Sequence, residues 1–123
     1  MSAQAVFELQ PNGVLVVRSG ADVLRTIDQI DGMLISAATP VSDHVVLLLT
    51  KTKKWGTAEN LVCLNLRAEV VWRAPILESS PYPKEYASVA LSDDGKLVAH
   101  TWGGIRATID AATGRVLSEV FVK

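Results

Sequence analysis

The sequence predicts an all-β fold in which antiparallel strands follow one another as a meander. Short runs rich in β-branched residues alternate with turn sequences along the chain, a pattern typical of hairpins. The turns contain Asn-Gly, Asp-Gly, Gly-Gly and Thr-Gly pairs, which favour tight connections between strands. Hydrophobic residues make up 49% of the 123 residues, enough for a core without a disulfide or metal. We therefore expect one β domain over residues 1–123.

Five strands are predicted by the turn that precedes each of them. They are residues 14–17 after Asn12-Gly13, 45–50 after Asp43-His44, 97–99 after Asp94-Gly95, 105–109 after Gly103-Gly104, and 116–122 after Thr113-Gly114. Within these strands and those expected over residues 61–72 we expect a set of buried side chains, with Trp72 and Trp102 packed against neighbouring strands. The set is Val46, Leu48, Leu64, Val71, Val98, Ile109 and Val116.

Residues 21–34 allow two interpretations. Five apolar side chains follow a helical spacing there. They are Val23, Leu24, Ile27, Ile30 and Leu34. Thr26 and the isoleucines favour a strand, and Gly32 interrupts the end of the segment. We predict a strand, with a helix as the alternative.

A strand-turn-strand pattern occurs twice along the chain. The matching pairs are residues 37–49 with 86–99 and residues 61–72 with 107–118. Asn65 and Asp110 open the second turn of each copy, where an Asx side chain can accept hydrogen bonds from backbone amides ahead of it. The copies lie about 45 residues apart and hold four strands each, which is the length and strand number of one propeller blade.

These turns resemble those of quinoprotein-type (PQQ-like) β-propeller repeats. Residues 110–117 carry the motif, and residues 65–72 are similar, with Trp72 at the position of the family's blade tryptophan. The resemblance covers residues 37–122 and implies blade-like four-stranded sheets. The units it implies are about 1–34, 35–75 and 84–123.

The resemblance also implies an incomplete propeller. Ala68 stands where the family has glycine, and Ser118 stands where it has tryptophan. Propellers close with typically four to eight blades, and only two clear blades and a weaker third are present. Because the family's cofactor requires the complete ring, we expect no cofactor, and no active-site residue of the family carries over.

Composition argues against several kinds of partner. The net charge is -1, without the basic excess of a nucleic-acid-binding protein. The longest strong apolar run, residues 45–49, is far shorter than the roughly 20 residues that span a bilayer. The first residues lack the features of a secretory signal, and the single cysteine, Cys63, reads as a small buried hydrophobe. We therefore expect a cytoplasmic protein with no nucleic-acid or membrane partner.

No cluster in the sequence predicts catalysis or metal binding. Ser42, Asp43 and His44 are adjacent, which a turn explains better than a catalytic triad. His44 and His100 lack partners at metal-ligand spacing, and residues 93–95 lack the later ligands of an EF-hand. We expect a protein that is not an enzyme and holds no metal.

Two loops are the candidate partner-binding regions. The tip at residues 51–56 is longer than its counterpart in the second copy, and such insertions often map to a binding face. The proline-rich loop at residues 75–84 loses little entropy on binding, and tyrosines lie in and beside it. The candidate contacts are Lys51, Lys53, Lys54, Trp55, Tyr82 and Tyr86. A solvated hairpin tip and an ordered connection are the structural alternatives.

These features predict a non-catalytic protein-interaction module, of which a bacterial toxin-immunity protein is one specific version. The alternative is a structural subunit that assembles with copies of itself to complete a propeller-like ring. For that reason we expect a homodimer slightly more than a monomer. A small-ligand binder or an enzyme ranks third.

Overall fold

The computed structural model confirms the all-β, antiparallel meander. It describes residues 5–50 and 59–122, which form twelve strands and no helix. Strands that are hydrogen-bonded neighbours are also neighbours in the sequence. The described residues therefore contain no helix of the length and apolarity needed to cross a membrane. Residues 21–34 form strands, so the helical alternative was wrong.

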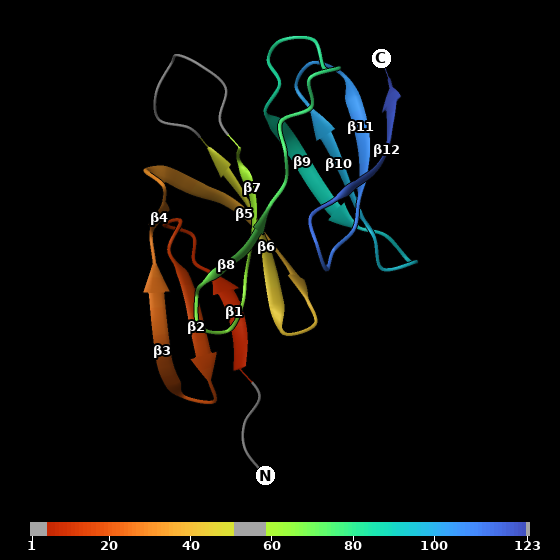
Figure 1. The fold of residues 1–123 in the computed structure, drawn as a ribbon. Helices are drawn as coiled ribbons and strands as arrows, with labels where there is room; N and C mark the ends of the chain where they lie inside the picture. Colours follow the sequence, from red (N-terminus) through yellow and green to blue (C-terminus); the bar gives the residue numbers. More distant parts are fainter. Residues whose placement is uncertain (1–4, 51–58, 123) are drawn as a thin grey trace.

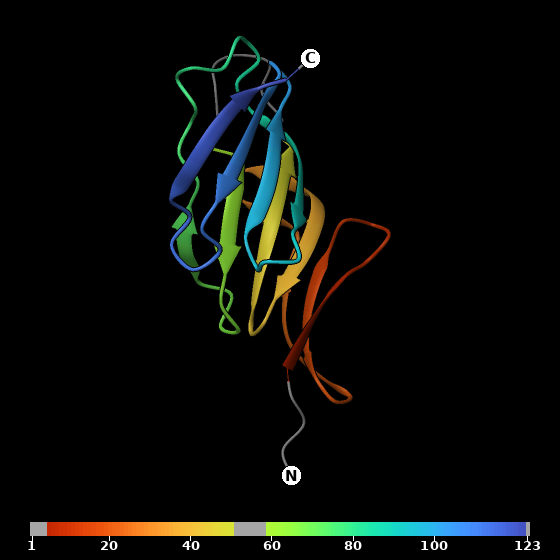
Figure 2. The same ribbon diagram turned by 90° about the vertical axis from the view of Figure 1, so that its right-hand side faces the viewer.

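The strands form three sheets. The N-terminal sheet contains β1 (Ala5–Leu9), β2 (Leu15–Ser19) and β3 (Asp22–Ile27). The middle sheet contains β4 (Gln29–Ile30), β5 (Met33–Val41), β6 (His44–Thr50), β7 (Leu61–Leu64) and β8 (Val70–Arg73). The C-terminal sheet contains β9 (Tyr86–Leu91), β10 (Leu97–Thr101), β11 (Ile105–Ile109) and β12 (Val116–Phe121), the four strands of a blade. The middle sheet lies between the other two (Figure 1), and the C-terminal sheet lies across one of its faces (Figure 2).

Strand β6 is buried on both faces because the N-terminal sheet packs on one face of the middle sheet and the C-terminal sheet packs on the other. Val45, Leu47 and Leu49 join the core shared with the N-terminal sheet. Val46 and Leu48 point the other way and join the core shared with the C-terminal sheet. Successive side chains of a strand point to opposite faces, so a strand covered twice reads as a continuous apolar run. The sequence of β6 has this form because both of its faces are covered.

Strand β7 continues the same division. Val62 and Leu64 lie in the first core, while Leu61 and Cys63 lie in the second. Cys63 is completely buried, which confirms the prediction for this residue. Burial, with a smaller effect of the Asp43 charge, raises the pKa of its thiol from 9.0 to about 11. The thiol therefore stays protonated and unreactive near neutral pH.

The two Asx turns form as the sequence predicts. The backbone N–H of Arg67 donates to Oδ1 of Asn65 at 2.9 Å. At the equivalent place in the C-terminal sheet, the N–H of Ala112 donates to Oδ1 of Asp110 at 2.9 Å. Each side chain thus fixes the turn that joins the last two strands of its sheet.

Gly114 and Ala68 take the left-handed conformation in these two turns, with φ of 77° and 63°. A Cβ at Gly114 would lie 2.5 Å from Cε3 of Trp72, so the turn of the C-terminal sheet packs directly on this indole. The indole N–H of Trp72 donates to the carbonyl of Ala111 at 2.9 Å. Trp72 therefore joins the middle sheet to the C-terminal sheet, as expected for a buried tryptophan of β8.

Four of the seven predicted core side chains are buried, namely Val46, Leu48, Leu64 and Ile109. Val71 was predicted wrongly because β8 is an edge strand, and its side chain is 44% exposed. Val98 and Val116 are only half-buried, since Val98 alternates with the buried neighbours Leu97 and Ala99 on β10.

Trp102 was also predicted wrongly. It lies after the end of β10, in the turn that leads to β11, and is 68% exposed. The pairing of β10 with β9 ends at Thr101 and its pairing with β11 ends at His100, so Trp102 has no cross-strand partner beside it.

Candidate functional site

A cavity of about 460 Å³ opens where the middle and C-terminal sheets meet, at the end of β6. Its lining comes from β5, β6, β9, the β10–β11 turn and residues 74–85, which link β8 to β9 and are called the crossover below. The side chains most relevant to its chemistry are Leu48, Thr50, Tyr82, Glu85, Tyr86 and Trp102.

The crossover is tied to the β10–β11 turn. Oγ of Ser80 and Oγ1 of Thr101 lie 2.9 Å apart, and both residues are buried. The backbone N–H of Trp102 donates to the carbonyl of Glu85 at 3.1 Å. An added Cβ at Gly103 would lie 1.9 Å from the carbonyl oxygen of Pro81, so the turn and the crossover touch through their backbones. The two segments therefore form one support for the cavity.

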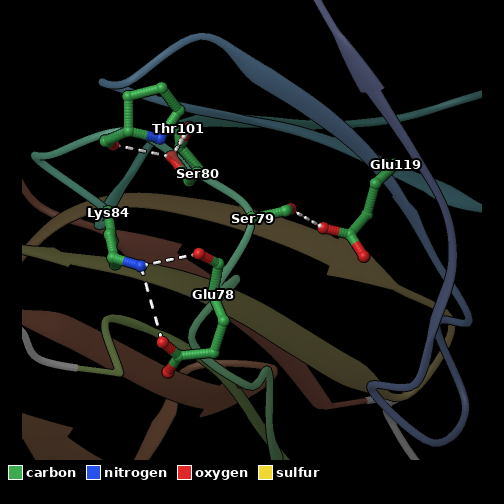
Figure 3. A network of polar contacts seen from close by, with 7 residues as sticks. Glu78, Ser79, Ser80, Lys84, Thr101 and Glu119 are labelled. Atoms are coloured by element: carbon green, nitrogen blue, oxygen red, sulfur yellow. Dashed lines mark hydrogen bonds and ion pairs between the residues drawn. The ribbon is translucent and has the colours of Figure 1, made fainter.

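A second set of contacts holds the outer side of the crossover (Figure 3). Nζ of Lys84 donates to the carbonyl of Glu78 at 2.8 Å and lies 3.5 Å from its carboxylate. Oγ of Ser79 donates to the carboxylate of Glu119 on β12. These contacts join the crossover to itself and to the last strand.

Asn60 fixes the inner wall of the cavity. Its buried amide Nδ2 donates to the carbonyl oxygens of Leu49, at 3.0 Å, and Tyr86, at 2.8 Å. Its Oδ1 accepts the backbone N–H of Tyr86 at 3.0 Å. Because these bonds occupy both amide hydrogens, Asn60 holds β9 against the end of β6 instead of offering donors to a ligand.

Two large aromatic side chains lie exposed on this cavity. Tyr82 is 64% exposed on the crossover, and Trp102 is 68% exposed on the β10–β11 turn. Tyr86 is only 3% exposed, and its hydroxyl donates to the carbonyl of Pro75 at 3.3 Å. Burial, and to a smaller degree the charge of Glu119, raises the pKa of Tyr86 to about 12. Tyr86 thus forms part of the wall and presents little surface to a partner.

Glu85 lines the cavity, but both of its carboxylate oxygens are buried. This residue is 6% exposed. The described residues that line the cavity include no lysine, arginine or histidine. The one charged residue among these described lining residues is therefore acidic.

The predicted contacts are thus distributed unequally. Tyr82 and Tyr86 meet at one cavity, whereas Lys51, Lys53, Lys54 and Trp55 lie outside the described residues. Sequence reasoning missed Trp102, which it assigned to a strand. The Gly103-Gly104 pair directly after it was the available signal, because a tryptophan beside a tight turn lies outside the paired strands.

A second cavity, of about 450 Å³, is lined in part by His44 and Lys96. Nδ1 of His44 lies 2.7 Å from Oδ1 of Asp43, and Ser42 has a positive φ of 56°. Ser42 and Asp43 thus form the β5–β6 turn that the sequence predicts. Within residues 5–50 and 59–122, no group of three His, Cys, Asp or Glu side chains could hold a metal ion.

Comparisons with known proteins identify a family and a fold. A family model described as a domain of unknown function (DUF7957) matches residues 30–121. No curated protein gives a significant match.

Two crystal structures of computationally designed proteins are similar in fold. The Ika8 protein, in its first crystal packing in P63, has a TM-score of 0.64 and 17% identity. That match covers 100% of this chain and 35% of Ika8, so the chain spans about a third of that protein. The Ika4 protein has a TM-score of 0.63 and 17% identity, over 98% of this chain and 68% of Ika4. At such identities the likeness extends to the fold alone.

Proposed function

This chain belongs to the DUF7957 family of domains of unknown function, and we propose that it is a non-catalytic module that binds another protein at the Tyr82–Trp102 cavity.

The observation that carries this proposal is the pair of exposed aromatic side chains at one cavity. Tyr82 and Trp102 expose most of their surface to water although both are large. Tyrosine and tryptophan are enriched among the residues that dominate binding energy at protein interfaces. Each combines a wide apolar ring with a polar group that remains solvated or bonds a partner.

The contacts that hold the segments of Tyr82 and Trp102 in place also favour a role in protein binding. The Ser80–Thr101 contact and the Trp102–Glu85 backbone bond hold their two segments together before any partner arrives. A binding surface that is already ordered loses less conformational entropy on association than a flexible one. The same segments carry no group of side chains arranged for acid–base or nucleophilic chemistry, so we propose binding rather than catalysis.

Narrower versions of the proposal follow from the sequence. One is a cytoplasmic toxin-immunity protein of a bacterium, which would occupy and block the toxin through this cavity. Another is that the domain descends from a quinoprotein-type propeller repeat, since residues 110–117 resemble such a repeat. The loop with Lys51, Lys53, Lys54 and Trp55 follows directly on Thr50, a residue of the cavity, and we propose it as an additional contact.

The test is affinity enrichment from native cell extract with four forms of the protein, followed by quantitative mass spectrometry. We expect at least one protein that wild type retains and that Tyr82→Ala and Trp102→Ala each lose several-fold. Leu24→Ala is the matched control, because Leu24 is also an exposed apolar residue, but it lies on β3 and lines neither cavity. Equal retention by all four forms would contradict the proposed site.

Self-assembly has its own supporting observation. The edge strand β12 exposes the apolar side chains of Leu117, Val120 and Phe121, and its outer edge has no partner strand among the described residues. Open edges of this kind favour pairing with another chain. Light scattering across a concentration series tests this: a dimer that Val120→Lys abolishes supports it, and a constant monomer mass contradicts it.

A further inference from the structure

Strand β12 is the outermost strand of the C-terminal sheet (Figure 2), and β11 is its only partner strand among the described residues. The backbone N–H of Val122 donates to the carbonyl of Gly104 at 2.7 Å, so Val122 directs its N–H toward β11. This direction alternates along an antiparallel pair, which means that Val120 also faces β11, whereas Glu119 and Phe121 face away from it. Glu119 and Phe121 therefore present backbone donors and acceptors along the outer edge of the sheet.

The other edge strands of the three described sheets are protected in ways that β12 lacks. Strand β3 carries Asp22 and Arg25, β1 carries Glu8, and β4 and β8 have only two and four residues. Strand β9 packs on β5 and β6, and the backbone N–H and carbonyl of Tyr86 both bond the side chain of Asn60. Charged side chains, short strands and covering groups are the usual means by which proteins prevent an edge from pairing with another chain.

The side chains of β12 favour such pairing instead. Leu117, Val120 and Phe121 are exposed apolar residues among its six, and Glu119 is its single charged residue. The carboxylate of Glu119 accepts a hydrogen bond from Ser79, which leaves the outward backbone groups of Glu119 available. An added strand would cover the apolar side chains and bond the backbone groups at the same time.

A second copy of this chain can supply that strand, because one antiparallel register of β12 with itself has no conflict. Centring the pair on Glu119 would place like charges directly opposite each other. Centring it on Leu117 or Ser118 would include the irregularity that β12 has beside Leu117. Centring it on Phe121 would leave most of each strand unpaired, since β12 ends there. Centring it on Val120 avoids all three, and each Glu119 then exchanges two backbone hydrogen bonds with Phe121 of the other copy.

We infer that two copies of this chain pair antiparallel along β12, with the twofold axis at Val120, and join their C-terminal sheets into one continuous sheet. The two Val120 side chains lie directly opposite each other on one face of that sheet. On the other face the two Phe121 side chains lie in diagonal positions, within reach of each other. The inference rests on the self-assembly proposed above and adds the register of the contact.

Cysteine cross-linking tests the register directly. Val120→Cys places two thiols at a directly opposite pair, where the Cα–Cα distance of about 4.5 Å suits a disulfide. Ser118→Cys is the matched control, because Ser118 is exposed on the same face of β12 but lies away from the axis. Leu24→Cys, exposed on β3, measures random collisions, and the unsubstituted protein checks that buried Cys63 does not react. During oxidation with diamide, we expect the covalent dimer to form at least fivefold faster with Val120→Cys than with either control.

Opposite charges at Phe121 test its contact with Glu119. In this register Phe121→Lys places an ammonium group opposite each Glu119, whereas Phe121→Glu places a second carboxylate there. Both variants remove the same exposed ring, so each is the control for the other. Sedimentation equilibrium at low ionic strength should give a dimer dissociation constant at least fivefold larger for Phe121→Glu than for Phe121→Lys.

Two kinds of result would overturn the inference and separate it from the proposals above. Fastest cross-linking with Ser118→Cys, or equal dissociation constants for the two Phe121 variants, would reject the register, while a dimer that Val120→Lys abolishes would still support self-assembly. A monomer at every concentration, with equal cross-linking of all three cysteine variants, would reject a second copy at β12 and self-assembly with it. A protein from cell extract that wild type retains and Val120→Lys loses would then assign this edge to a strand of another protein. The enrichment experiment with Tyr82→Ala and Trp102→Ala decides the cavity separately.

Discussion

Strand β6 of the middle sheet and strand β10 of the C-terminal sheet bury their side chains in different patterns. Strand β6 buries five consecutive side chains, Val45 to Leu49, whereas β10 buries every second one, Leu97, Ala99 and Thr101. The difference follows from position, because β6 has a sheet on each side and β10 has one on one side only. An uninterrupted apolar strand therefore marks the layer on which the rest of the domain packs.

The middle sheet also divides the hydrophobic core into two clusters. One cluster joins the middle sheet to the N-terminal sheet, and the other joins it to the C-terminal sheet. Neither cluster contains residues from both outer sheets. The outer sheets are therefore held to each other through the middle sheet.

Substitutions at neighbouring positions of β6 and of β10 should have the largest effects and test the difference between these two strands. Leu47→Ala and Leu48→Ala should each lower the free energy of unfolding by about 2–5 kcal/mol, because each removes a buried side chain from a different core. On β10, Leu97→Ala should have an effect of that size, while Val98→Ala should cost less than about 1 kcal/mol because its site is half-buried. Urea unfolding measures all four. A small effect at either Leu47 or Leu48 would mean that β6 is covered on one face only.

A smaller effect is expected where the C-terminal sheet packs on Trp72. Gly114→Ala should cost about 2–4 kcal/mol, because the new methyl group overlaps the indole and alanine is strained at φ of 77°. Gly95→Ala is the control, since its φ is 82° but nothing lies within 4 Å of the added carbon. It should cost only about 1–2 kcal/mol. Equal losses of melting temperature would remove the Trp72 contact from the explanation.

Alkaline pH tests the core between the middle and C-terminal sheets. The pKa of Cys63 is about 11 in the folded protein against 9.0 ordinarily, so the unfolded chain loses this proton first. Stability should therefore fall as the pH rises from 9 to 11, by about 1 kcal/mol at pH 10. Urea unfolding at pH 8 and pH 10 measures the difference. Cys63→Ala should show less of it, with the remaining change at higher pH due partly to Tyr86, and an unchanged pH dependence would contradict this assignment.

The smallest effect is expected at the other copy of the Asx turn. Ala68 has a φ of 63°, where alanine is strained and glycine is not. Ala68→Gly should therefore stabilise the protein by up to about 1 kcal/mol. Thermal unfolding measures the gain, and Arg67→Gly controls for the added flexibility of any glycine. A loss of stability at Ala68 would show that its methyl group packs usefully in the turn.

Local patterns predicted the local structure well. The Asx residues Asn65 and Asp110 identified their turns, because the bonds they make reach only a few residues ahead. The strands were predictable too, because a run of β-branched residues between two turns is also a local pattern. The sequence did not reveal that β8 lies at an edge, since strand order depends on the whole sheet, and Val71 was misplaced as a result.

The candidate site was predicted only in part. Tyr82 was identified because it lies in a proline-rich loop, and that information is local. Trp102, the other exposed aromatic residue at the cavity, lies twenty residues further along the chain. The two meet because the crossover packs on the β10–β11 turn through Ser80, Thr101 and Gly103. No periodicity or motif records a contact of this kind.

The sequential order of the strands has a consequence for biosynthesis. Every hydrogen-bonded strand neighbour in the three sheets is also the neighbour along the chain. Short loops close quickly and at low entropic cost, so each hairpin can form soon after its second strand leaves the ribosome. The N-terminal sheet can therefore pair its strands first, but its apolar face has no cover until β5, β6 and β7 have been made. During that interval the nascent chain exposes Leu15 and its apolar neighbours, and this is the stage of synthesis at which a chaperone would be of most use.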